Sequence, residues 1–223
     1  MQLNQLLKIQ KDIYQGVSSI LDGNLELFSF VGSSSTRTFV EGWSDIDILI
    51  VISNYVDDQV LRVYNFVKTV SNVKVGISLF STEEINKNRV DNKNAINLHL
   101  IQTGKLIPQY ISKNLDLGTF LFGEHIIREK AMRAYYLSLI KGVIYNDDRS
   151  IDTRKFFKYC INVIKINLIE KGIIVRTSEE LIFELEKSKH SSSQVIIDIL
   201  LKIPDISYDD VCIIGKYVIN NFM

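Results

Sequence analysis

Two aspartates, Asp45 and Asp47, are the residues of this sequence whose type and spacing most clearly favour chemistry. They stand at the start of an apolar run that ends at Ile52 and is typical of a buried strand. Side chains two residues apart on a strand point to the same face, so the two carboxylates are expected to lie close together. Because Mg²⁺ binds one or two carboxylates and completes its shell with water and phosphate oxygens, the pair predicts a magnesium site beside a phosphate ligand.

A glycine–serine turn upstream of this pair predicts the phosphate site. Gly32 lacks a Cβ, so a ligand can approach its backbone closely. Ser33 or Ser34 is expected to be the N-cap of a short helix, whose N-terminal N–H groups and dipole suit a phosphate. Taken alone, the turn or the aspartate pair would be explained as well by a solvated loop and a strand end. In this order and spacing they indicate a nucleoside triphosphate site, with Gly32, Ser33, Arg37 and Ser44 as candidate nucleotide-binding residues; a surface role explains Arg37 equally well.

Residues 30–52 resemble the DNA polymerase beta-like nucleotidyltransferase superfamily, and within it the small-molecule branch that includes the aminoglycoside nucleotidyltransferases. The shared pattern is an apolar residue followed by Gly-Ser, a spacer, and Asp-x-Asp in an apolar strand, here Val31-Gly32-Ser33 and Asp45-Ile46-Asp47. The resemblance implies an α/β fold with a mixed sheet and flanking helices. It also implies Mg²⁺-dependent transfer of a nucleoside monophosphate from ATP or another NTP to a hydroxyl of a small-molecule acceptor. Asp45 and Asp47 would be the catalytic residues and the metal ligands.

The sequence departs from the superfamily pattern on the next expected strand, residues 73–80. Enzymes of the superfamily usually carry a third carboxylate there, whereas the polar face of this strand offers Lys74, Gly76 and Ser78. An alternative function is therefore a nucleotide-binding regulator or partner protein of the same fold that has lost efficient transfer. If an acid from elsewhere substitutes, the candidates are Glu83 and Glu84, followed by Glu124, Asp147 and Asp148; a helix first turn or a solvated turn would also explain these acids.

Hydrophobic periodicity changes along the chain and predicts two domains, an α/β domain over residues 1–115 and an all-helical domain over residues 116–223. In the first domain we expect strands at residues 25–31, 45–52 and 73–80, with 45–52 central and helices on one main face. Helices are expected at residues 3–21, 57–70 and 94–103. The second domain carries broad apolar stripes at residues 126–144 and 153–171, and a capping box at residues 177–180.

Composition narrows the class of partner. Lys and Arg together number 26, as do Asp and Glu, and this balance weighs against a dedicated nucleic-acid-binding protein. No apolar run reaches transmembrane length, and the N-terminal residues lack the apolar core of a signal peptide. We therefore expect a cytoplasmic protein whose partners are a nucleoside triphosphate and a small hydroxylated acceptor, without membrane or nucleic acid.

Overall fold

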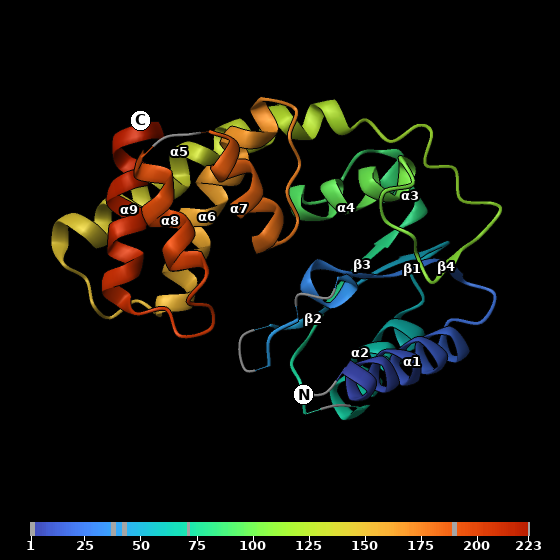
Figure 1. The fold of residues 1–223 in the computed structure, drawn as a ribbon. Helices are drawn as coiled ribbons and strands as arrows, with labels where there is room; N and C mark the ends of the chain where they lie inside the picture. The colour runs from blue at the N-terminus through green and yellow to red at the C-terminus, as the bar shows by residue number, and fades with distance from the viewer. Residues whose placement is uncertain (1–2, 37–38, 42–43, 71, 189–190, 223) are drawn as a thin grey trace. The chain divides into compact units, whose positions relative to one another are not determined.

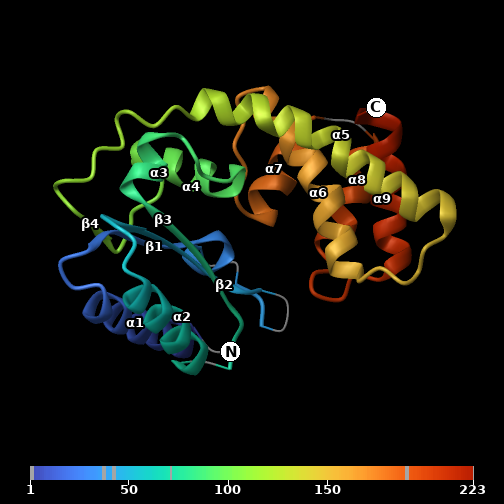
Figure 2. The same cartoon turned by 180° about the vertical axis from the view of Figure 1, so that it is seen from behind.

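The computed structural model describes residues 3–36, 39–41, 44–70, 72–188 and 191–222 of the 223-residue chain. The chain divides into two compact units, residues 1–122 and residues 123–223. The first unit contains a sheet with flanking helices, and every described element of the second unit is a helix (Figures 1 and 2). The domain limits expected from the sequence, 1–115 and 116–223, stay a prediction.

The first unit is built on a four-stranded sheet in the order β3-β2-β1-β4. β1 (Leu25–Val31) runs antiparallel to β2 (Ile46–Ile52) and to β4 (Tyr110–Ile111). β2 runs parallel to β3 (Val75–Ser81), so the sheet is mixed, as expected. β2 lies between β1 and β3, which makes the strand that follows Asp45 an interior strand.

Helices cover both faces of this sheet, so the expectation of one main helical face is wrong (Figure 1). On one side lie α1 (Leu3–Ile20) and α2 (Asp57–Val70), and on the other lie α3 (Thr82–Asn86) and α4 (Asn92–Gln102). The physical reason is that β2 is apolar on both faces. Ile48 and Ile50 are fully buried on the α1–α2 side, and Leu49 and Val51 are fully buried on the opposite side.

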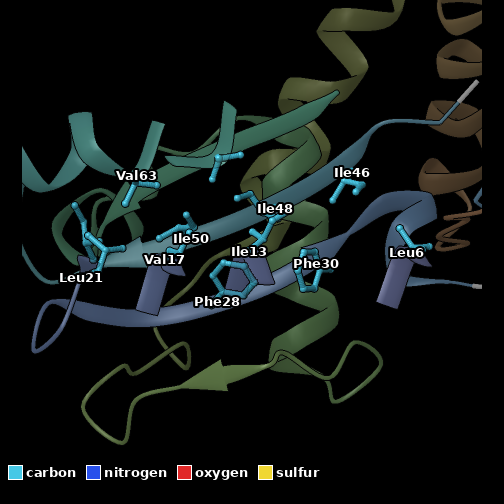
Figure 3. Packing of buried hydrophobic residues seen from close by; sticks show 12 residues of the cluster. Leu6, Ile13, Val17, Leu21, Phe28, Phe30, Ile46, Ile48, Ile50 and Val63 are labelled. Carbon is cyan, nitrogen blue, oxygen red and sulfur yellow. The ribbon is translucent and has the colours of Figure 1, made fainter. Parts of the chain in front are cut away.

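The core beneath β2 fixes the direction of its side chains. Ile46 and Ile48 pack in a buried cluster with Phe28 and Phe30 of β1 and with apolar side chains of α1 and α2 (Figure 3). The rings of Phe28 and Phe30 contact each other edge to face, with centroids 5.2 Å apart. Since Ile46 and Ile48 both point into this core, Asp47 between them must point to the opposite face of the sheet.

The described elements of the second unit are helices. They are α5 (Phe122–Asn146), α6 (Thr153–Glu170), α7 (Ser178–Lys187), α8 (Ser191–Leu200) and α9 (Tyr208–Phe222). Side chains cap the N-termini of α6 and α7. Thr177 caps α7 by accepting a hydrogen bond from Glu180 N at 3.1 Å. The carboxylate of Glu180 also accepts a hydrogen bond from Arg176 N at 2.6 Å. Among the described residues, no helix has the length and apolar character needed to cross a membrane.

Candidate functional site

The candidate site lies where β2 begins. Asp47 is the second residue of β2, and Asp45 directly precedes the strand. Their side chains are partly exposed, at 28% for Asp47 and 18% for Asp45, although the strand beyond them is fully buried. Strand alternation places the Asp47 carboxylate on the face opposite the α1–α2 core, and Asp45, which pairs with Lys74 just before the strand, is expected to share that face.

The carboxylate of Asp47 lies between two glycines. In the sheet register Asp47 stands opposite Val31 on β1 and opposite Gly76 on β3. A Cβ on Gly76 would lie 2.6 Å from Oδ1 of Asp47, and a Cβ on Gly32 would lie 3.1 Å from Oδ2. The carboxylate thus fills the space that a side chain at either position would need. An acid introduced at residue 76 would therefore require the Asp47 carboxylate to shift.

Gly32 opens a short 3-10 helix, η1 (Gly32–Ser35), with φ of +66°. This left-handed conformation favours glycine and starts the helix at residue 32, so Val31 holds the N-cap position without a side-chain hydrogen bond. The prediction that Ser33 or Ser34 is the N-cap is therefore wrong. Ser34 Oγ donates to Val31 O at 2.9 Å and Ser35 Oγ donates to Gly32 O at 2.8 Å. In contrast, the hydroxyl of Ser33 makes no hydrogen bond within the described part of the chain.

The other two candidate nucleotide-binding residues are Ser44 and Arg37, and only Ser44 lies in the described part of the chain. Ser44 Oγ accepts a hydrogen bond from Val40 N at 3.0 Å, and Ser44 N donates to Val40 O at 2.7 Å. This reciprocal pair closes the connection just before Asp45, so the hydroxyl of Ser44 already has a structural partner. Arg37 lies outside the described residues.

Glu84, one of the expected substitutes for the third acid, is used to cap α3. Its Oε2 accepts from Ser81 N at 2.8 Å and from the Tyr55 hydroxyl at 2.7 Å. Burial raises the pKa of Glu84, but these hydrogen bonds outweigh it and hold the pKa below its usual value. Burial and the nearby Glu84 carboxylate raise the pKa of Tyr55 to about 12. Glu84 is therefore a charged structural residue.

The register explains why this cap is remote from the aspartates. Ser81 stands opposite Ile52, at the end of β2 away from Asp47. In a parallel pair both strands start at the same edge, so residues that follow β3 lie at the far edge of the sheet. Exposed Glu83 follows the same strand and pairs with Lys87, so the prediction that either glutamate supplies the third carboxylate is wrong. The other candidates, Glu124, Asp147 and Asp148, belong to the second unit.

Two lysines face the aspartates. Lys93 Nζ from α4 lies 3.1 Å from Oδ2 of Asp47, and Lys74 Nζ lies 3.9 Å from Oδ2 of Asp45. Lys74 was visible in the sequence as a polar residue of the next strand, whereas Lys93 was missed. The helix was expected to begin at Asn94, and the contact depends on α4 crossing the sheet face that carries Asp47, for which the local sequence gives no signal.

The site fits a magnesium ion only as a two-carboxylate site. Within the described ranges, no group of three or more histidine, cysteine, aspartate or glutamate side chains is arranged to hold a metal. Two carboxylates on one face are nevertheless enough for Mg²⁺ when phosphate and water oxygens complete its shell. Asp45 and Asp47 are therefore the residues that could hold the ion.

Comparison with known proteins identifies the fold. No family model matches the chain, and no curated protein matches its sequence. Among solved structures, the chain is similar to spectinomycin adenyltransferase AAD(9) from Enterococcus faecialis, whose crystal structure contains ATP and spectinomycin. The similarity covers 96% of this chain and 98% of that chain, with a TM-score of 0.62 and 14% identity. The chain has an aminoglycoside nucleotidyltransferase-like fold.

The nucleotidyltransferase-like fold places the glycine–serine turn and the aspartate pair on two neighbouring strands. Val31, just before the turn, stands opposite Asp47 in the β1–β2 ladder. The nucleotidyltransferase-like sheet thus brings Gly32 next to the Asp47 carboxylate. The two parts of the sequence pattern therefore lie next to each other in the sheet.

Proposed function

We propose that this protein is a Mg²⁺-dependent nucleotidyltransferase that moves a nucleoside monophosphate from ATP or another NTP to a hydroxyl of a small-molecule acceptor. The observation that carries the proposal is the position of the Asp47 carboxylate. It lies on the face that Asp45 is expected to share and directly beside Gly32, where a Cβ would be 3.1 Å from Asp47 Oδ2. The similar solved structure supports the type of reaction, because that protein is an adenyltransferase crystallised with ATP and spectinomycin.

Each part of the site has a task in this proposal. Asp45 and Asp47 would hold the Mg²⁺, which when bound supplies positive charge to the phosphate oxygens. Gly32 has no side chain, so the β- and γ-phosphates can approach its backbone. Ser33 adds a hydroxyl that is not bonded to other described residues, and the first N–H groups of a helical turn lack acceptors within that turn. Ser44 holds the chain that leads into Asp45.

The reaction would be an in-line displacement. The acceptor oxygen attacks the α-phosphorus, the bond from that phosphorus to the bridging oxygen breaks, and pyrophosphate leaves. The protein contributes mainly position and charge, as in other phosphoryl transfers. The proton of the acceptor hydroxyl would pass to solvent, because β3 provides no carboxylate beside Asp47.

A second candidate function is a nucleotide-binding regulator or partner protein that transfers slowly or not at all. The specific observation in its favour is Gly76, which stands opposite Asp47 on β3 and supplies no acid there. General-base assistance is typically worth about a hundred- to ten-thousand-fold in rate. Nucleotide binding would be retained in either case, so binding and transfer must be measured separately.

The binding test uses melting temperature with Mg²⁺ and each of the four common nucleoside triphosphates. A ligand that binds only the native state raises the melting temperature. The double variant Asp45→Asn with Asp47→Asn should lose the Mg²⁺-dependent part of this rise. The matched control is Asp57→Asn with Asp58→Asn, which removes two exposed carboxylates from the first turn of α2. A normal response in the Asp45 and Asp47 double variant would show that these carboxylates are not the site.

The transfer test follows pyrophosphate release and the mass of a panel of hydroxylated small molecules. Release of pyrophosphate together with a nucleoside monophosphate added to an acceptor supports the enzyme. Binding of Mg-NTP without either product supports the second candidate function. The same double variant should abolish transfer in the first case.

A further inference from the structure

Lys93 makes the shorter of the two described ion pairs at the candidate site. This ion pair adds little to the free energy of folding. Its Nζ lies 3.1 Å from Oδ2 of Asp47, while the two side chains are 59% and 28% exposed. Ion pairs of this exposure contribute roughly 0–1 kcal/mol to folding. An ammonium group has three donors, and Asp47 accepts from one side of it. The exposed remainder of the Lys93 head group can therefore donate to a ligand.

Hydrogen bonds of the buried residue Asn94 hold the start of α4 in place next to this lysine. Asp91 caps α4 by accepting from Asn94 N at 3.1 Å. The side-chain amide of Asn94, only 2% exposed, donates to Asp91 Oδ2 at 2.7 Å and to Ser78 Oγ of β3 at 2.9 Å. The residue after Lys93 is thus fixed to the strand that flanks Asp47. This anchoring sets the backbone of Lys93 beside the site before any ligand binds.

The charge of the site is consistent with one divalent cation plus this lysine. A site with three carboxylates and two divalent cations leaves one net positive charge for the nucleotide. Two carboxylates, one divalent cation and one lysine leave the same net charge. Here Gly76 stands opposite Asp47 and supplies no third acid, and Lys93 brings an ammonium group to the same carboxylate.

We propose that Lys93 supplies the second positive charge of the site. Its ammonium group contacts phosphate oxygens of the bound nucleoside triphosphate, and Asp45 and Asp47 hold a single divalent cation. This inference rests on the proposed nucleotide site, but it does not require efficient transfer. Lys74 does not share the role, because its Nζ lies 3.9 Å from Asp45 and its side chain is 80% exposed.

The test compares three variants of the full-length chain: Lys93→Met, which removes the charge; Lys93→Arg, which keeps it; and Lys74→Met as the matched control. Binding is measured for Mn²⁺ alone by electron paramagnetic resonance, and for the Mn²⁺ complexes of ATP, GTP, CTP and UTP by calorimetry. Ligand-free melting temperatures check folding, and exposed Lys93 should change them little.

Lys93→Met should bind free Mn²⁺ more tightly, because it removes a competing cation, and should bind the best Mn-NTP at least about tenfold more weakly, because a charged hydrogen bond is lost. Lys93→Arg should keep Mn-NTP affinity, and Lys74→Met should stay within about twofold of the wild type. Equilibrium dialysis should find one Mn²⁺ per bound nucleotide.

The two proposals fail in different ways. Equal or tighter Mn-NTP binding by Lys93→Met, or two Mn²⁺ ions per nucleotide in the wild type, would overturn the role of Lys93 alone. Failure of the wild-type protein to bind any of the four Mn-NTP complexes would overturn the nucleotide site and the role of Lys93 together.

Discussion

Gly76 and Asp47 are register partners in the parallel β2–β3 pair, and a Cβ at residue 76 would lie 2.6 Å from Oδ1 of Asp47. A side chain at residue 76 would therefore need the Asp47 carboxylate to shift. Gly32 limits the same carboxylate from the β1 side. The orientation of Asp47 depends on two residues that have no side chains.

Gly76→Ala should weaken Mg-NTP binding, because the new methyl group must push the Asp47 carboxylate aside. The free energy of unfolding should change by about 1 kcal/mol or less, since the group that moves is the end of a partly exposed side chain. Melting temperatures with and without Mg-NTP separate the two effects. Gly142→Ala in α5 is the control, because a Cβ there meets nothing within 4 Å. A full nucleotide response in Gly76→Ala would contradict this view of Asp47.

Gly32→Ala and Gly23→Ala form a matched pair, with φ of +66° and +71°. Each should lose roughly 1–2 kcal/mol of unfolding free energy, because alanine is strained in the left-handed region. Only the Cβ at residue 32 would meet a neighbour, Asp47 Oδ2 at 3.1 Å. Denaturant titration should therefore show similar losses, whereas calorimetry with Mg-NTP should show weaker binding for Gly32→Ala alone. Equal nucleotide affinities in the two variants would argue against a ligand at Gly32.

Ile50→Ala should destabilise the first unit by about 2–5 kcal/mol, because it leaves a cavity in the core that supports β2. Leu61→Ala on α2 should cost far less, since Leu61 is 60% exposed. Urea denaturation of both variants measures the difference. Similar losses would mean that the cluster around Ile50 is not the core of this unit.

Asp210 should make the stability of the second unit depend on acidic pH. Its carboxylate accepts hydrogen bonds from Lys202 Nζ and from Ser207 N and Oγ. These bonds, with Lys202 the largest cause, lower the pKa of Asp210 to about 2. The folded state thus favours the charged form, and this contribution is present above the unfolded pKa of about 3.9 and is lost as the pH falls toward the folded value.

Asp210→Asn should therefore be less stable than the wild type near neutral pH, and its unfolding free energy should fall less between about pH 4 and pH 2. Chemical denaturation over this range provides the measurement. Asp205→Asn, an exposed aspartate nearby in sequence, controls for the loss of one charge. Parallel pH profiles for Asp210→Asn and the wild type would contradict the assignment.

The helices and strands that could be predicted from the sequence are those marked by a local residue pattern. The helix expected at residues 57–70 has the same limits as α2, because acids in its first turn and apolar spacing both mark it. The strand after Asp45 followed from the same kind of local pattern, and so did the direction of the Asp47 side chain. The unbroken apolar run through Leu49 and Val51 also carried a signal that was not used, since it indicates a strand buried on both faces.

The parts that did not follow from sequence depend on contacts between distant segments. Gly76 meets Asp47 only because β3 pairs with β2 in one particular parallel register. Lys93 reaches Asp47 only because α4 lies across that face, and Glu84 is remote only because β3 runs parallel to β2. No local propensity encodes these relationships, since register and packing are set by the whole core.

The antiparallel pairing of β1 and β2 has a consequence for how the site assembles during folding. Val31 and Asp47 pair within a single hairpin, so the turn at Gly32 meets its aspartate after the closure of one short loop. Loop-closure entropy grows with the length of chain between two contacts, and contacts of low sequence separation form fastest. We therefore expect the phosphate turn and the carboxylates to come together first. Gly76 and Lys93 can reach Asp47 only after α2 and α4 have packed on the sheet. The Lys93 ammonium group would therefore join the site after Asp45 and Asp47 are already beside the turn.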